Sequence, residues 1–110
     1  VATLDLAGTD WVVLSACHSG AGDAWSHEGR LGMRRAFALA GARTVIASAW
    51  ALGDEDTGEW MHALYDARLR QHADATAAIR AADRAMLDAR RARKRSTHPF
   101  YWAAFSASGR

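Results

Sequence analysis

The sequence predicts an α/β fold in which helices cover a mostly parallel β-sheet. Two continuous apolar runs, Trp11–Ala16 and Arg43–Trp50, have the pattern of strands that are buried on both faces. Segments with helical spacing follow each of them, and a third strand-like run, Phe100–Ser106, lies near the end of the chain. The predicted order is therefore β-α-β-α-α-β, and such alternation is typical of a sheet sandwiched by helices.

Three helices are indicated by apolar residues that recur three and four positions apart. The first extends from about residue 30 to residue 40, where Gly41 supplies a C-terminal stop. The second begins at Asp54–Thr57, where Asp56 and Glu59 resemble a capping box, and a break at His72–Asp74 precedes the third. The residues predicted to face the core are Met33, Ala36, Phe37 and Ala40 in the first helix, Met61, Leu64, Tyr65 and Leu69 in the second, and Ile79, Ala82, Met86 and Leu87 in the third.

The length of 110 residues predicts at most one domain, and a single core is feasible because half of the residues are hydrophobic. No apolar run approaches the roughly 18 residues that span a bilayer, and no secretory signal opens the chain. A net charge of +2 is too small to indicate a nucleic-acid partner. One cysteine cannot form an internal disulfide, which fits the cytoplasm. A single lysine, Lys94, among 14 basic residues indicates a GC-rich bacterial genome, and Val1 at the start indicates a piece of a longer protein.

Cys17 is the candidate catalytic residue. It lies at the carboxyl end of the first predicted strand, just before a glycine-rich loop over Gly20–Gly29. Chemistry in open α/β sheets gathers outside the carboxyl ends of strands, which favours a nucleophile over the alternative, a small buried hydrophobe. A thiol needs a partner to become a thiolate at neutral pH. His18 is a poor one, because successive side chains on a strand point to opposite faces.

The other histidines offer no convincing base, since each is predicted on the surface or in a loop: His27, His62, His72 and His98. Other sites are excluded by their motifs. The chain has no HExxH or CxxC for zinc, no GxGxxG for a dinucleotide and no GxSxG elbow for a serine hydrolase. Asp23 stands where a cysteine phosphatase would need an arginine. We therefore expect neither a metal nor an organic cofactor.

Several motifs, in order along the chain, resemble the CHAT domain, a family of caspase-like cysteine peptidase domains. They are LSAC at Leu14–Cys17, Glu28-Gly29, GxxRAFxxAGA over Gly32–Ala42, VIASAW at Val45–Trp50, the turn at Asp54–Thr57 and HPFYWAAF at His98–Phe105. The resemblance implies a three-layer α/β sandwich of the caspase–haemoglobinase type. It also implies peptide-bond hydrolysis by a Cys–His dyad, with no cofactor.

The resemblance assigns the nucleophile to Cys17, whose backbone N–H would contribute to the oxyanion hole. The family histidine belongs to a His-Gly motif on the preceding strand, whereas none of the 16 residues before Cys17 is a histidine. We therefore expect this chain to be the C-terminal part of one CHAT-like domain and to be inactive by itself. The implied partners are a protein substrate and fused or associated repeat or sensor domains. The alternative function is a non-catalytic CHAT-like interaction or scaffold module.

Two departures from the family pattern concern the substrate pocket. Family members commonly have Trp-Pro-Val-Asp-Asp where this chain has the segment Trp50–Asp54, so one of the two acids is missing. Asp54 alone would then hold a basic residue before the cut, or it is simply a helix cap. His18 replaces a common acid and would change the mouth of the pocket. The basic run Arg90–Arg95 is predicted to be a solvated helix end, and Tyr101 and Trp102 are predicted to be core aromatics.

Overall fold

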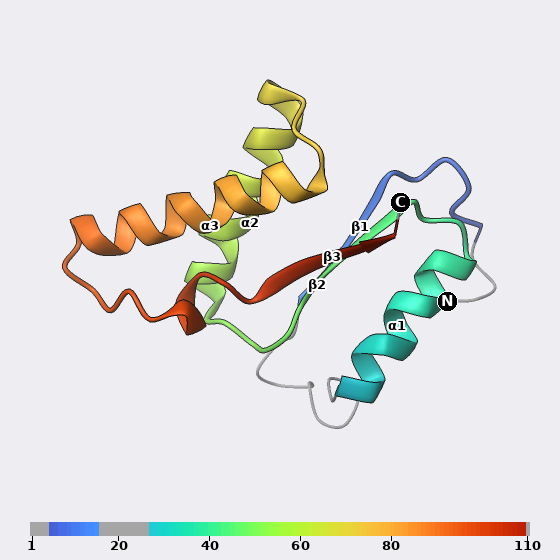
Figure 1. The fold of residues 1–110 in the computed structure, drawn as a ribbon, viewed down its shortest axis with the longest axis horizontal. Helices are drawn as coiled ribbons and strands as arrows, with labels where there is room; N and C mark the ends of the chain where they lie inside the picture. Colours follow the sequence, from blue (N-terminus) through green and yellow to red (C-terminus); the bar gives the residue numbers. More distant parts are fainter. Residues whose placement is uncertain (1–4, 16–26, 110) are drawn as a thin grey trace. The chain divides into compact units, whose positions relative to one another are not determined.

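The computed structural model describes residues 5–15 and 27–109, without the side chains of residues 27, 28 and 30. These residues form three strands and three α-helices in the predicted β-α-β-α-α-β order, which confirms the α/β class (Figure 1). The chain divides into two compact units, residues 1–51 with 105–110, and residues 52–104. The three-layer sandwich stays a prediction.

The first unit holds a three-stranded sheet in the order β1-β2-β3 (Figure 1). Its strands are β1 (Trp11–Leu14), β2 (Thr44–Ser48) and β3 (Phe105–Gly109). β1 pairs with β2 in parallel, with Leu14 opposite Ala47, and β3 pairs with β2 in antiparallel. β2 is buried over its whole length, as its β-branched centre predicts. One parallel and one antiparallel pair make this sheet mixed rather than mostly parallel.

Helix α1 (His27–Leu39) connects β1 to β2 and packs against β2. Parallel neighbours need such a crossover. Because the helix starts at His27, residues 27–29 do not belong to the predicted loop. Gly41 follows the helix with φ +116°, and a Cβ there would lie 2.7 Å from the backbone nitrogen of Ala7. Only glycine fits this close approach, so the predicted helix stop is confirmed.

The predicted strand Phe100–Ser106 is wrong in its position. Residues Pro99–Tyr101 form a 3-10 turn, and the strand begins only at Phe105. Proline fixes its own φ and lacks an N–H, and His98 Nδ1 accepts a hydrogen bond of 3.1 Å from the N–H of Phe100. This local bond stabilises a turn instead of a strand, and Tyr101 and Trp102 are half-buried before the strand begins.

The second unit is built on a hairpin of two helices, α2 (Asp54–Gln71) and α3 (Ala75–Ala92) (Figure 1). The short break between them is as predicted. His72 ends α2 in the left-handed region at φ 55°. Asp74 caps α3, because its side chain accepts a hydrogen bond of 2.8 Å from the N–H of Ala77.

The core of the hairpin lies along a different stripe of α2 from the predicted one. Of the predicted α2 residues, Leu64 is buried, whereas Tyr65 is 41% and Leu69 is 73% exposed. Alanines on α3 let the two helices approach closely around the fully buried indole of Trp60. The buried hydrophobic residues of the hairpin are Trp60, Leu64, Ala67, Ala78, Ala82 and Met86.

Arg90 is buried, at 8% exposure, and is not the solvated helix end that its basic neighbours predict. Its Nε donates a 2.5 Å hydrogen bond to the carbonyl oxygen of Ser96, and its Nη1 lies 3.5 Å from Asp56 Oδ2. Its guanidinium carbon lies 3.9 Å from the centre of the Tyr101 ring. One side chain thus joins both helices to the segment that leads to β3.

The predicted capping box does not form. Gly53 occupies the N-cap position of α2, and no side chain caps this end of the helix. Asp56 pairs with Arg90 instead, and Glu59 accepts a 3.0 Å hydrogen bond from Arg93. Both acids are therefore used to hold the C-terminal end of α3.

Asp83 on α3 is the titratable group whose environment changes its protonation most clearly. Its Oδ1 accepts a 2.8 Å hydrogen bond from Trp60 Nε1. Burial raises the pKa of Asp83 from 3.8 to about 6, and the bond from Trp60 opposes this effect. Because the pKa of Asp83 is higher in the folded state than in the unfolded chain, binding of a proton to Asp83 stabilises the folded state. This contribution to the free energy of unfolding is complete below about pH 4 and is lost as the pH rises through 6.

We therefore expect Asp83→Asn to stabilise the protein at neutral pH. The rise in pKa corresponds to at most roughly 3 kcal/mol, and solvent contact reduces the expected gain to about 1 kcal/mol. Urea unfolding of wild type and variant should show this gain at about pH 7.5 and none at about pH 4. Asp66→Asn removes the same charge from a surface pair with Arg70 and should give no gain at neutral pH. A gain that is equal at both pH values would contradict the prediction.

Candidate active site

The carboxyl edge of the parallel strands forms the candidate site. β1 and β2 end beside each other, since Leu14 is opposite Ala47. β3 starts at the same edge, because Phe105 is opposite Ser48. Ser48 and Phe105 are buried, at 2% and 5% exposure, while Ser15 just beyond β1 is exposed. Ser15, the last described residue after β1, is therefore exposed at the kind of edge where ligands of open α/β sheets bind.

A cavity of about 340 Å³ lies next to this edge within the first unit. It extends from the end of β2, at Ser48 and Ala49, along the outer strand β3 and under α1. Its volume is at the small end of ligand sites and matches one or two amino-acid side chains. The lining residues are Leu31, Arg34, Ser48, Ala49, Ser106, Ala107 and Ser108.

Arg34 of α1 lines this cavity and binds the elements around it through hydrogen bonds. Its Nη1 donates to the carbonyl oxygen of Val45 at 3.0 Å and to Ser108 Oγ at 2.8 Å. Its Nη2 donates to the carbonyl oxygen and the Oγ of Ser106, at 2.9 and 2.8 Å, and to the carbonyl oxygen of Ala47 at 3.4 Å. The guanidinium thereby ties α1 to β2 and to β3 at once.

Sequence reasoning missed Arg34. The quoted motif includes its neighbour Arg35, which is exposed. The position of Arg34 on the helix could have indicated its role. Arg34 lies three residues before Phe37 and thus at the border of the apolar face of α1. An arginine at such a border can bury its stem and direct its guanidinium across the sheet.

The predicted nucleophile and its neighbour, Cys17 and His18, lie outside the described residues. In the sequence, Cys17 follows the last described residue of this edge, Ser15, by two positions. Its catalytic role stays a prediction, as does the effect of His18 on a pocket.

Asp54 is the first residue of α2 and is exposed. It is not the N-cap, which is Gly53, so the simple capping interpretation is wrong. Asp54 belongs to the unit of residues 52–104, whereas the strand edge belongs to the other unit. Its role toward a basic substrate residue stays a prediction.

The histidines whose side chains the structure describes all lie in the unit of residues 52–104 and are exposed. His62 is on α2, His72 ends that helix, and His98 Nδ1 accepts the bond from Phe100. Among the side chains that the structure describes, no three His, Cys, Asp or Glu gather as metal ligands. The part of the chain that the structure describes also holds no helix long and apolar enough to cross a membrane.

The fold is thus α/β, with a candidate site at the carboxyl edge of parallel strands. A family model of the CHAT domain matches residues 1–110, so this chain belongs to the CHAT domain family. The match confirms the family predicted from the motifs and indicates a caspase-like, peptidase-related module. Comparisons with curated proteins and with solved structures gave no significant match.

Proposed function

We propose that this chain is the nucleophile-bearing part of a cysteine endopeptidase that cuts a protein partner. The observation that supports the proposal is the parallel pairing of β1 and β2, whose carboxyl ends at Leu14 and Ala47 lie side by side at the kind of edge where α/β proteins collect their ligands. In the sequence, the only cysteine of the chain, Cys17, follows Leu14 by three positions. Membership in the CHAT family supports the same chemistry.

In the proposed mechanism, the Cys17 thiolate attacks the scissile carbonyl carbon, and the resulting acyl-enzyme is hydrolysed by water. A histidine takes the thiol proton and then protonates the leaving amine. By resemblance to the family, this histidine belongs to sequence upstream of the chain. Asp54 and His18 are proposed to contact the substrate, with Asp54 facing a basic residue before the cut.

The test uses the full-length parent protein and a library of fluorogenic peptides. We expect Cys17→Ala to lower kcat/KM by roughly 10³-fold or more, because removing a nucleophile leaves only binding and oxyanion contributions. Ser15→Ala, two residues earlier, is the matched control and should keep most of the activity. Equal cleavage by wild type and Cys17→Ala would overturn the proposal. The 110-residue chain by itself should show no turnover.

The second candidate function is a non-catalytic interaction module of the CHAT type. It is favoured by one observation in the sequence: none of the 16 residues before Cys17 is a histidine. The sequence upstream of Val1 in the parent protein decides between the two. A His-Gly motif there supports the peptidase, and its absence supports the interaction module.

A further inference from the structure

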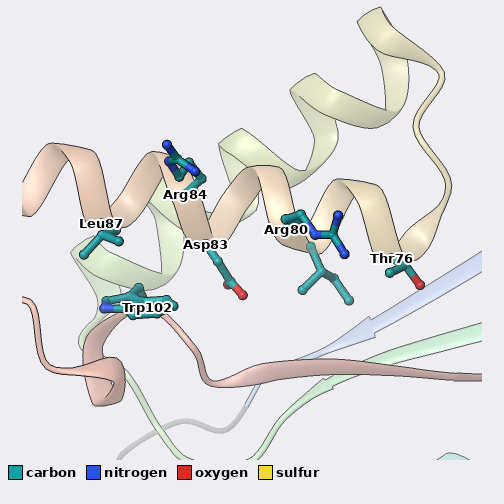
Figure 2. A pocket seen from close by; sticks show the side chains of 7 residues that line it. Thr76, Arg80, Asp83, Arg84, Leu87 and Trp102 are labelled. Carbon is teal, nitrogen blue, oxygen red and sulfur yellow. The ribbon is translucent and has the colours of Figure 1, made fainter.

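A cavity of about 360 Å³ lies on one side of α3, entirely within the unit of residues 52–104 (Figure 2). α3 contributes Ile79, Asp83 and Leu87, which are four residues apart and so share one face of the helix. Trp102, from the segment before β3, contributes an aromatic ring to the same cavity. The lining of the cavity thus combines apolar side chains with one carboxyl group, one hydroxyl group and two arginines, and its volume is at the small end of ligand sites.

The Trp102 ring is held in place. Its Nε1 donates a 2.9 Å hydrogen bond to the carbonyl oxygen of Thr97, and the residue is half-buried. The polar edge of the indole is therefore occupied within the protein. A fixed indole next to a carboxyl group is a favourable surface for a cation, which is attracted to the face of the ring.

The Asp83 carboxyl is also oriented, by the 2.8 Å bond that Trp60 Nε1 donates to Oδ1. The structure gives Asp83 no ion pair with any residue that it describes. The carboxylate is therefore partly removed from water without a neutralising partner, and this burial is what raises its pKa. A cationic ligand would supply the missing charge.

Two arginines, Arg80 and Arg84, also line the cavity, and their positive charges oppose the binding of a cation. Both are exposed, and the Arg84 Nε lies 3.9 Å from Asp88 Oδ2 on the next turn of α3. In Figure 2, Arg84 extends from the opposite side of α3 to Asp83, whose carboxyl is directed to the side on which Trp102 lies. Arg80 is drawn nearer to the side of Asp83 in Figure 2, but the structure gives no ion pair between these two residues.

We propose that this cavity binds an arginine side chain of a protein partner. The guanidinium would pair with the Asp83 carboxylate and stack on Trp102, and the aliphatic stem would pack between Ile79 and Leu87. An arginine suits the site because its planar cation can make both contacts together. The proposal does not rest on peptidase activity, since none of these residues belongs to the sheet or its edge.

The test follows the indole N–H signals of the 110-residue chain by NMR. The probes are three capped tripeptides, Ac-Ala-Arg-Ala-NH2, its glutamine counterpart and its glutamate counterpart. We expect the arginine peptide alone to shift the Trp102 signal in a saturable way. Asp83→Asn, which keeps the oxygen that accepts the bond from Trp60, should weaken this binding roughly tenfold. Asp66→Asn removes the same charge elsewhere and should leave the affinity within about twofold.

A second measurement needs no variant. The ligand keeps its charge between about pH 7.5 and about pH 5, whereas Asp83 gains a proton, so wild-type affinity should fall over this range. The other charged groups that line the cavity are Arg80 and Arg84. Three results would each overturn the proposal: no saturable shift at Trp102, equal shifts with the glutamine or glutamate peptide, or an affinity that neither Asp83→Asn nor acid lowers.

Discussion

Replacing Arg90 with methionine is expected to lower the free energy of unfolding by about 2–3 kcal/mol. The methionine keeps most of the apolar stem but has no donors. Asp56 is then left without its cationic partner, at 23% side-chain exposure, and the carbonyl oxygen of Ser96 loses its 2.5 Å bond. Tyr101 loses the cation that lies 3.9 Å from its ring centre. The loss should appear as a lower urea midpoint in far-UV circular dichroism.

The matched control for this prediction is Arg93→Met, one turn further along the chain. Arg93 also contacts an acid of α2, through a 3.0 Å bond to Glu59, but about half of its side chain is exposed. Exposed pairs contribute little, because water competes for both charges. The midpoint of Arg93→Met should therefore stay close to that of wild type. If Arg90→Met and Arg93→Met lowered the free energy of unfolding equally, the contribution of Arg90 to stability would not depend on its burial.

Arg90 also illustrates where sequence reasoning fails. A run of five basic residues among Arg90–Arg95 is typical of a solvated helix end. Pattern alone cannot show that one of the arginines faces Asp56, because the acid is 34 positions earlier and belongs to another helix. Similarly, α2 carries two apolar stripes at helical spacing, and only packing against α3 selects the one that contains Trp60.

The order of elements could be predicted because it depends on local signals. The β-branched centre of β2 and the glycine at position 41 mark a buried strand and a helix end without any partner. The position of β3 could not be predicted, since its sequence, Phe-Ser-Ala-Ser-Gly, has little strand propensity. It becomes a strand because β2 and Arg34 offer partners for its backbone and its serines.

The location of the candidate site could be predicted from the sequence, but the contacts that hold the elements around it together could not. A cysteine after an apolar run predicts an edge site, and the described ends of β1 and β2 form such an edge, although the four residues of β1 are half-buried rather than buried on both faces as predicted. The cavity beside that edge depends on contacts between α1 and β3, which are more than 70 positions apart in the sequence. The arginine that makes these contacts is in a motif whose spacing points to its neighbour, Arg35.

Replacing Arg34 with methionine is expected to lower the free energy of unfolding by about 2 kcal/mol, and the destabilisation should be concentrated in the first unit. Five acceptor atoms lose their donor, among them the carbonyl oxygen and the Oγ of Ser106. Hydrogen exchange should therefore quicken at the amides of β3, while the amides of α2 and α3 keep their protection. Arg34→Lys should recover only part of the loss, because one ammonium cannot reach acceptors on two strands as a planar guanidinium does.

Arg35→Met is the control, because it removes the same type of side chain from an exposed position of α1. It should change neither the urea midpoint nor the exchange of β3. A double-mutant cycle with Ser106→Ala then measures the coupling directly, and we expect a smaller effect of Arg34→Met when the serine is absent. If the effects of Arg34→Met and Ser106→Ala on the free energy of unfolding simply add, the hydrogen bond between these two residues is contradicted. β3 begins opposite Ser48, so a loosened β3 also loosens the strand edge. On the proposed peptidase function, Arg34→Met should therefore lower kcat in the full-length parent, while Arg35→Met should not.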